Sequence, residues 1–349
     1  MINKPFDKAL FAKALSKQDK QINFKFLILI FNLFICLFAY LFIFSSNINA
    51  QQITLSINPP IVELLVKPGK ALLIGYTLQN LGDPTTLSVK IRTFSPQGDY
   101  GEMVIDPELI SPIRFSLDNT DMQFEQPIFM KQRDTIQALV RIRVPEGTPE
   151  GDYYFTVMAE TEPAPQIGGA STSLAKATIG SNLLLTVTKS GRVEIKGRVA
   201  LFQIVPDFTF PLFGREYQVV ESGKKIPIDL VIQNQGKNLM KPQGEVVLRG
   251  SLGEKISYPL LSQNILTDSS RLLKTTQDGD SPYQHSILLS GYFMGPYTLS
   301  ANVNFGEGTP QLYANTSFIG LPIRFVTAMI IVMVISILII ISKRKRKKE

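Results

Sequence analysis

ALLIGYTLQN (71–80), LGDP (81–84) and TTLSVKIRTF (85–94) form one continuous stretch, in which two alternating apolar runs flank a turn. Alternation of apolar and polar residues is typical of strands that bury one face. Similar short runs recur through residues 51–320, where no sustained 3.6-residue apolar period is present. The same region lacks Trp and Cys, which excludes the antibody type of core. The sequence therefore predicts an all-β ectodomain made of two tandem immunoglobulin-like β-sandwiches.

An internal repeat supports the division into two domains. A Gly-Lys pair is followed nine residues later by Gln-Asn-x-Gly, and the whole pattern recurs at an offset of 154. The residues are Gly69, Lys70, Gln79, Asn80 and Gly82 in the first copy, and Gly223, Lys224, Gln233, Asn234 and Gly236 in the second. In each copy a glycine turn precedes a strand that ends in an Asn-x-Gly turn. The domains expected are residues 51–190 and 191–320.

The N-terminal segment 1–50 has the layout of a secretory signal. Lysines in the first 25 residues precede the uncharged run 26–44, and Ala50 follows a polar stretch. These features predict a signal peptide cleaved after Ala50. The apolar run is longer than is usual for a signal, so an uncleaved signal anchor remains the alternative. Cys36 lies inside the apolar run, where it is expected to be an ordinary residue of that run and not a site of lipid attachment.

The C-terminal segment 321–342 is expected to be a transmembrane helix. Twenty-two helical residues span about 33 Å, enough for the hydrocarbon core of a bilayer. The tail 343–349 is strongly basic, which predicts that it stays in the cytoplasm and sets the orientation. Its orienting residues are Lys343, Arg344, Lys345, Arg346, Lys347 and Lys348. The expected location is the cell membrane, crossed once with residues 51–320 outside, or twice if the N-terminal segment is uncleaved.

Charge and composition exclude several function classes. The net charge is +7, but residues 1–25 carry +4 and residues 321–349 carry +6, which leaves −3 on residues 51–320. A mildly acidic body is not expected to bind nucleic acid. The chain has one Cys and one His (His285), and no phosphate loop or nucleophile elbow is present in the sequence. No enzyme activity, metal or cofactor is predicted.

Two blocks of sequence carry a resemblance to a known family. PGKALLIGYTLQNLGDPTTLSVKI (68–91), VRIRVPEGTPEGDYYFTV (140–157) and NLLLTV (182–187) resemble the first extracellular domain of the WxL-interacting proteins of bacterial cell surfaces. IDLVIQNQGKNLMKPQGEVVLRGSLGE (228–254), NILTDSSR (264–271) and GPYTLSANVNFGEG (295–308) are similar to the second. The resemblance implies a non-catalytic, membrane-anchored scaffold. Its implied partners are peptidoglycan, through the first domain, and a wall-associated surface protein, through the second.

An envelope assembly chaperone is the alternative function. Residues 54–94 also look like the first domain of periplasmic pilus chaperones, which add a strand to the edge of a client. Those chaperones are released as soluble proteins, whereas the apolar run 325–341 predicts an anchored chain.

Two segments are candidates for binding. VPDFTFPLFG (205–214) holds Phe208, Phe210 and Phe213 between prolines, which exclude a central strand. Alternation places Phe208 and Phe210 on one face, expected to cap the core, and leaves Phe213 exposed. The same three residues are the candidate contact with a partner if the segment forms an exposed patch. Residues 95–135 exceed a simple loop, so additional strands are expected there, with a ligand-facing surface as the alternative.

Overall fold

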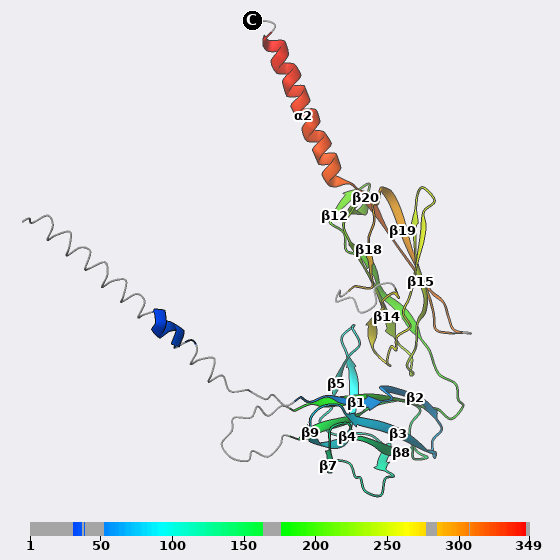
Figure 1. Cartoon of the computed structure of the whole chain (residues 1–349). Helices are drawn as coiled ribbons and strands as arrows, with labels where there is room; N and C mark the ends of the chain where they lie inside the picture. Colours follow the sequence, from blue (N-terminus) through cyan, green and yellow to red (C-terminus); the bar gives the residue numbers. More distant parts are fainter. Residues whose placement is uncertain are drawn as a thin grey trace, which may run out of the picture. The chain divides into compact units, whose positions relative to one another are not determined.

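The computed structural model describes residues 31–36, 38, 52–162, 176–276, 285–306 and 308–346, with side chains described as far as residue 340. Twenty strands and the C-terminal helix α2 (Ile323–Arg346) follow one another along the described residues, and Figure 1 labels most of them. Both sandwiches belong to one compact unit of the chain. Residues 31–36 and 38 are helical, while the expected cleavage point at Ala50 lies outside the described residues.

The first sandwich contains β1–β10. One sheet has the strand order β1-β3-β8-β6, and the other has β2-β10-β9-β4-β5, with β7 paired to β4. The strands are β1 (Leu55–Asn58), β2 (Ile61–Val66), β3 (Ala71–Asn80), β4 (Thr85–Gln97), β5 (Glu102–Ile105), β6 (Arg114–Leu117), β7 (Pro127–Met130), β8 (Thr135–Arg143), β9 (Gly151–Glu162) and β10 (Thr178–Val187). Inward-facing side chains of both sheets form one core around the fully buried Tyr76 and Phe155.

The second sandwich contains β11–β20. Its smaller sheet has the order β11-β14-β17, with β18 also paired to β14, and its larger sheet has the order β12-β13-β20-β19-β15-β16. The strands are β11 (Gly197–Ile204), β12 (Phe208–Leu212), β13 (Arg215–Glu221), β14 (Ile226–Asn234), β15 (Gln243–Gly250), β16 (Lys255–Pro259), β17 (Ser270–Leu272), β18 (Ile287–Leu289), β19 (Gly295–Asn304) and β20 (Leu312–Leu321). A separate core includes Ile228, Leu230, Leu299 and Phe318. The predicted fold class is therefore confirmed.

The repeated asparagines have equivalent roles in the two sandwiches. Asn80, at the end of β3, accepts a hydrogen bond of 3.1 Å from the Gly82 amide, and its side-chain amide donates to main-chain oxygens that include that of Met130. Asn234, at the end of β14, accepts one of 2.9 Å from the Gly236 amide and donates to the Ile265 oxygen. Both side chains are buried. They close the strand end by satisfying main-chain groups that would otherwise lie unpaired.

The strand β20 runs almost directly into α2. β20 ends at Leu321 and α2 begins at Ile323, so Pro322 alone separates them. The helix therefore begins two residues after the start of the predicted membrane segment, because Leu321 is still paired to Glu221 of β13. Ile323–Ile340 is long and apolar enough to cross a membrane, by length and composition. The helix continues to Arg346, while Lys347 and Lys348 lie outside the described residues, as do the side chains from residue 341 onward.

Candidate functional site

Asp152 links the two sandwiches at their junction. Its carboxylate accepts hydrogen bonds from the Asn238 side chain (2.9 Å) and the Leu239 main-chain amide in the second sandwich. In its own sandwich it accepts one of 2.7 Å from the Thr186 hydroxyl. A carboxylate with several donors around it is well satisfied without a cation. Asp152 is therefore a structural connector between the domains.

Tyr154 makes a second link beside Asp152. Its hydroxyl accepts a hydrogen bond of 2.9 Å from the Thr267 amide and lies 3.1 Å from the Thr267 hydroxyl. Burial, followed by the charge of Asp152, raises the pKa of Tyr154 well above its usual value. The phenol thus stays neutral, and its hydroxyl links the two sandwiches by hydrogen bonds.

Glu63 of β2 holds the junction from the other side. Its carboxylate lies 2.6 Å from the Lys241 ammonium and accepts a hydrogen bond of 2.7 Å from the Asn264 side chain. Burial acts to raise the pKa of Glu63, but the bonds from Lys241 and Asn264 bring it below the usual value. A main-chain bond of 2.7 Å from the Leu272 amide to the Asp99 oxygen adds a further link. The junction is a specific interface.

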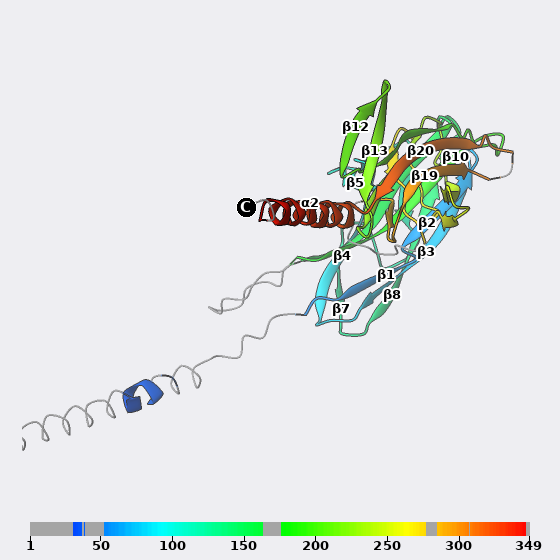
Figure 2. The same ribbon diagram turned by 90° about the horizontal axis from the view of Figure 1, so that it is seen from above.

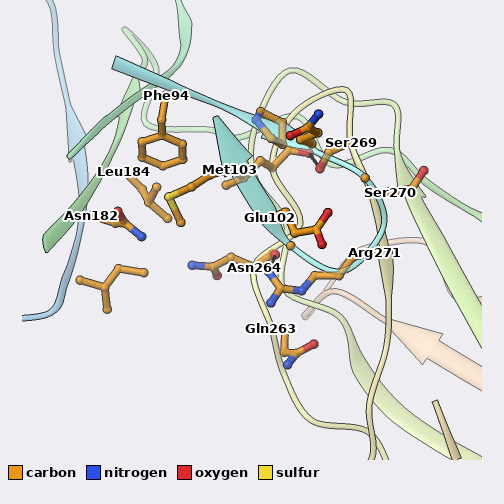
Figure 3. A pocket seen from close by; sticks show the side chains of 16 residues that line it. Phe94, Glu102, Met103, Asn182, Leu184, Gln263, Asn264, Ser269, Ser270 and Arg271 are labelled. Atoms are coloured by element: carbon orange, nitrogen blue, oxygen red, sulfur yellow. Dashed lines mark hydrogen bonds between the residues drawn. The ribbon is translucent and has the colours of Figure 1, made fainter. Parts of the chain in front are cut away.

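A cavity of about 310 Å³ lies within this junction. One wall is apolar and comes mostly from the first sandwich, with Ile61, Phe94, Met103 and Leu184. The other wall is polar and comes from residues 263–271 of the second sandwich, including Asn264, Ser270 and Arg271 (Figure 3). Apolar lining with a few polar groups is the usual character of a ligand site.

Arg271 is the unusual residue of the cavity. Its Nη1 atom donates a hydrogen bond of 2.9 Å to the Asn264 main-chain oxygen, but its buried Nε atom has no hydrogen-bond partner among the described residues. No ion pair joins Arg271 to a carboxylate within the described part of the chain, and Glu102, an exposed residue of β5 that also lines the cavity, makes none with it. Burial lowers the pKa of the guanidinium. A half-buried guanidinium with a free donor and no ion pair has the chemistry to bind an anion.

Gly101 makes room for this guanidinium. A Cβ atom at Gly101 would lie 2.5 Å from the Cζ atom of Arg271, and the backbone φ of Gly101 is +80°. Both conditions favour glycine at this position. The turn between β4 and β5 therefore lets the Arg271 side chain lie flat against the main chain of the first sandwich.

The segment 95–135 forms additional strands and also supplies part of the cavity wall. It forms the end of β4 and the three strands β5, β6 and β7, which confirms the expected additional strands. Glu102 and Met103 of β5 also line the cavity. Arg271 and Asn264, by contrast, could not be singled out from the sequence, since nothing in the run NILTDSSR indicates that either residue lines a cavity.

The three candidate phenylalanines lie away from the cavity, on the hairpin β12–β13. β12 is an edge strand, as its prolines predict. Phe213 is 93% exposed, as expected, but Phe208 is 43% exposed, so the prediction that it caps the core is wrong. Phe210 is half-buried and stacks on Tyr217, with ring centroids 5.5 Å apart, rather than entering the core. The reason is that β12 is at the edge of its sheet and pairs, among the described strands, with β13 alone, and neither Phe208 nor Phe210 belongs to the core of the second sandwich.

Two further ionisable side chains, His285 and Glu160, have partners within their own sandwich. His285 Nδ1 lies 2.8 Å from the Asp229 carboxylate. Glu160 forms ion pairs with Lys90 and Lys176, and the hydrogen bonds from Lys176 and Lys90 lower its pKa. No group of metal-ligating side chains gathers within the described residues.

No protein-family model matches the chain, and no curated protein does. Among solved structures, the class 5 fimbriae chaperone CfaA is 11% identical, with a TM-score of 0.34, over 77% of this chain and 100% of its own. The E. coli chaperone DraB is 12% identical, with a TM-score of 0.32, over 75% and 98%. The YadV chaperone is 11% identical, with a TM-score of 0.31, over 76% and 99%. At these values the similarity does not argue for a shared function.

Proposed function

We propose that the chain is a non-catalytic, membrane-anchored binding protein of the bacterial cell surface, whose junction cavity takes an acidic group. The observation that carries the proposal is the buried Nε atom of Arg271, which has no hydrogen-bond partner among the described residues and belongs to a residue that lines the cavity. An anion there would offset the desolvation of the cation and satisfy the Nε donor, and charge-assisted bonds of this kind are among the stronger ones. The apolar wall would contact an adjoining uncharged part of the ligand.

The cell wall, or a protein bound to it, is the source of the acidic group in this proposal. The resemblance to WxL-interacting proteins supports peptidoglycan or a wall-associated surface protein as the partner. The helix α2 supports anchoring, because it is long and apolar enough to cross a membrane. Residues 51–320 would then stand outside the cell, with the basic residues from Lys343 to Lys348 inside.

Binding of the full chain, in detergent micelles, to purified peptidoglycan tests the proposal. Arg271→Gln should reduce the retained fraction about tenfold, as expected for losing a charge-assisted bond, while Arg271→Lys should keep part of it. Arg114→Gln removes the same charge from the exposed strand β6 and is the matched control. Equal retention of the native chain and the three variants would contradict peptidoglycan as the source of the acidic group. Capture of a surface protein that depends on Arg271 would identify that protein as the partner instead.

Stability separates a binding defect from misfolding. Since Arg271 is desolvated without a counter-charge, Arg271→Gln should leave the unfolding temperature unchanged or raise it. A variant that binds less while unfolding at a higher temperature has lost recognition and not structure. A large fall in unfolding temperature would instead make Arg271 a structural residue.

An assembly chaperone is the second candidate. β2 lies at the edge of its sheet and pairs, among the described strands, with β10 alone, and its Ile61 and Leu65 side chains are exposed. An open apolar edge supports strand addition by a client. Leu65→Lys should then abolish co-purification of an envelope subunit, whereas it should leave retention on peptidoglycan unchanged.

A further inference from the structure

Three segments of the second sandwich lie at the end where β20 leads into α2, as the strand pairing shows. Gly295 of β19 is paired with Gly320 of β20, and Gly250 of β15 is paired with Tyr297 of β19. The turn 251–254 and the loop 290–294 therefore lie at the end where β20 enters α2. The main-chain amide of Ser222, just after β13, donates a hydrogen bond of 2.9 Å to the Leu321 oxygen, which brings a third segment to the same end.

Large apolar side chains are exposed on the turn and on the loop. Leu252 is 83% exposed, Tyr292 63% and Met294 55%. Between the last two, Phe293 is buried and packs edge-on against Tyr297 and Phe318, at centroid distances of 5.2 and 5.7 Å. Since Phe293 fixes the loop in the core, its neighbours Tyr292 and Met294 are held outward.

The hairpin β12–β13 adds an apolar face that begins at the same end. Its cross-strand pairs Phe208–Val219, Phe210–Tyr217 and Leu212–Arg215 alternate with Thr209–Gln218 and Pro211–Glu216, so one face is mostly apolar and the other mostly polar. Only Val219–Glu221 of β13 pairs with β20. The rest of the β12–β13 hairpin therefore extends beyond the sheet, as Figure 2 shows. From the pair Phe208–Val219 to the pair Leu212–Arg215 the hairpin advances by four residues, about 14 Å. Phe213 follows at its tip.

We propose that this end of the second sandwich rests on the bilayer surface, with Leu252, Tyr292, Met294 and the tip of the β12–β13 hairpin in the lipid interface. The inference rests on the membrane anchor of the proposed function. Its decisive support is that Pro322 alone separates β20 from α2, which leaves no spacer between the sandwich and the membrane. Arg324 on the first turn of α2 also pairs with Glu221 of β13, at 3.0 Å, and so holds the helix to this end.

Lipid is a better occupant of this surface than a wall ligand or a second copy. Aromatic side chains favour the membrane interface, where an apolar body and a polar tip are both satisfied. An isolated two-stranded hairpin is only marginally stable in water, so its apolar face gains from a cover. The bilayer supplies that cover, because α2 enters it beside the base of the hairpin.

The chain contains no Trp, so single substitutions create unique fluorescent reporters. Leu252→Trp, Tyr292→Trp and Phe213→Trp, each in the full chain, would be reconstituted in nanodiscs with and without brominated phosphatidylcholine. Bromolipid should reduce the emission of each reporter about twofold, as for a side chain at the interface, and aqueous iodide should quench each weakly. Tyr313→Trp is the control, since Tyr313 is 67% exposed but lies eight residues before Leu321, about 27 Å along β20.

Met329→Trp, inside α2, separates failure of the inference from failure of the anchor. Quenching of Met329→Trp by bromolipid with no quenching of the three surface reporters would overturn the inference and leave the anchor intact. No quenching at Met329 would overturn the anchor itself. Blue-shifted surface reporters that bromolipid does not quench would indicate a contact with protein instead, which also overturns the inference. Quenching at Leu252 and Tyr292 without Phe213 would remove the hairpin from the lipid contact.

Discussion

Asp152 of the first sandwich accepts a 2.9 Å hydrogen bond from the side-chain amide of Asn238 in the second. The same carboxylate also accepts from the Leu239 amide and from Thr186, so donors of both sandwiches converge on it. Asp152 is thus one of the side chains that hold the domains together around the Arg271 cavity, beside Tyr154 and Glu63.

Replacing Asp152 by Ala should destabilise the junction by about 1–3 kcal/mol, because buried donors lose their acceptor. Thermal unfolding of the full chain in detergent, followed by circular dichroism, would measure the change. Asp121→Ala, at an exposed position, is the matched control and should have no effect. An unchanged unfolding temperature for Asp152→Ala would show that the junction does not depend on this carboxylate.

Acid should weaken the junction through Glu63. The pKa of Glu63 is lowered in the folded protein, so its bonds stabilise the fold at pH values above the usual carboxyl pKa of 4.5. That contribution is lost as the pH falls through the lowered pKa, because the unfolded state then binds the proton more readily. The difference in unfolding temperature between the native chain and Glu63→Gln should therefore shrink from pH 7 to pH 3. A difference in unfolding temperature that stays constant with pH would mean that the charge of Glu63 does not contribute to stability.

Phe213→Asn should stabilise the β12–β13 hairpin. Phe213 and Gly214 have φ angles of +50° and +74°, the pattern of a type I′ turn, for which Asn-Gly is the favoured pair. The gain should be about 0.5–1 kcal/mol, seen as slower amide hydrogen exchange across β12 and β13. Phe213→Val, which is β-branched and disfavours positive φ, should speed exchange. The opposite order would show that the turn conformation does not limit the hairpin.

Neutralising the basic tail should disturb membrane orientation. In the proposed orientation the six basic residues from Lys343 to Lys348 would supply the positive-inside signal, so replacing them all with Gln should produce a population with the opposite orientation. An epitope tag after Glu349 should be protected from protease added to sealed cells in the native chain and cleaved in part in the variant. Cleavage in the native chain would show that the tail lies outside.

The sequence predicts the strands well where two sheets face each other. Alternation in residues 71–80 and 85–94 corresponds to β3 and β4, and the repeated Asn80 and Asn234 mark equivalent strand ends. These features are local, because a strand's pattern reflects which of its faces is buried and an Asx turn needs only neighbouring residues.

Features that depend on distant partners were not predictable in this way. Alternation correctly places Phe208 and Phe210 on one face of β12, but it carries no information on whether that face is buried, and Phe208 is exposed. Likewise, the environment of Arg271 arises where the first sandwich supplies Gly101 and the second supplies Asn264. Neither neighbour is recognisable from the sequence around Arg271.

The position of β20 has a mechanical consequence for an anchored protein. β20 lies inside its sheet, with nine residue pairs to β19 on one side and three to β13 on the other, and it leads into α2. Inter-strand hydrogen bonds run across the strand direction. A pull along β20 between the membrane and a partner held by the sandwiches therefore loads these bonds together, in shear, rather than peeling them apart singly. β20 is thus suited to bearing tension that is transmitted through α2.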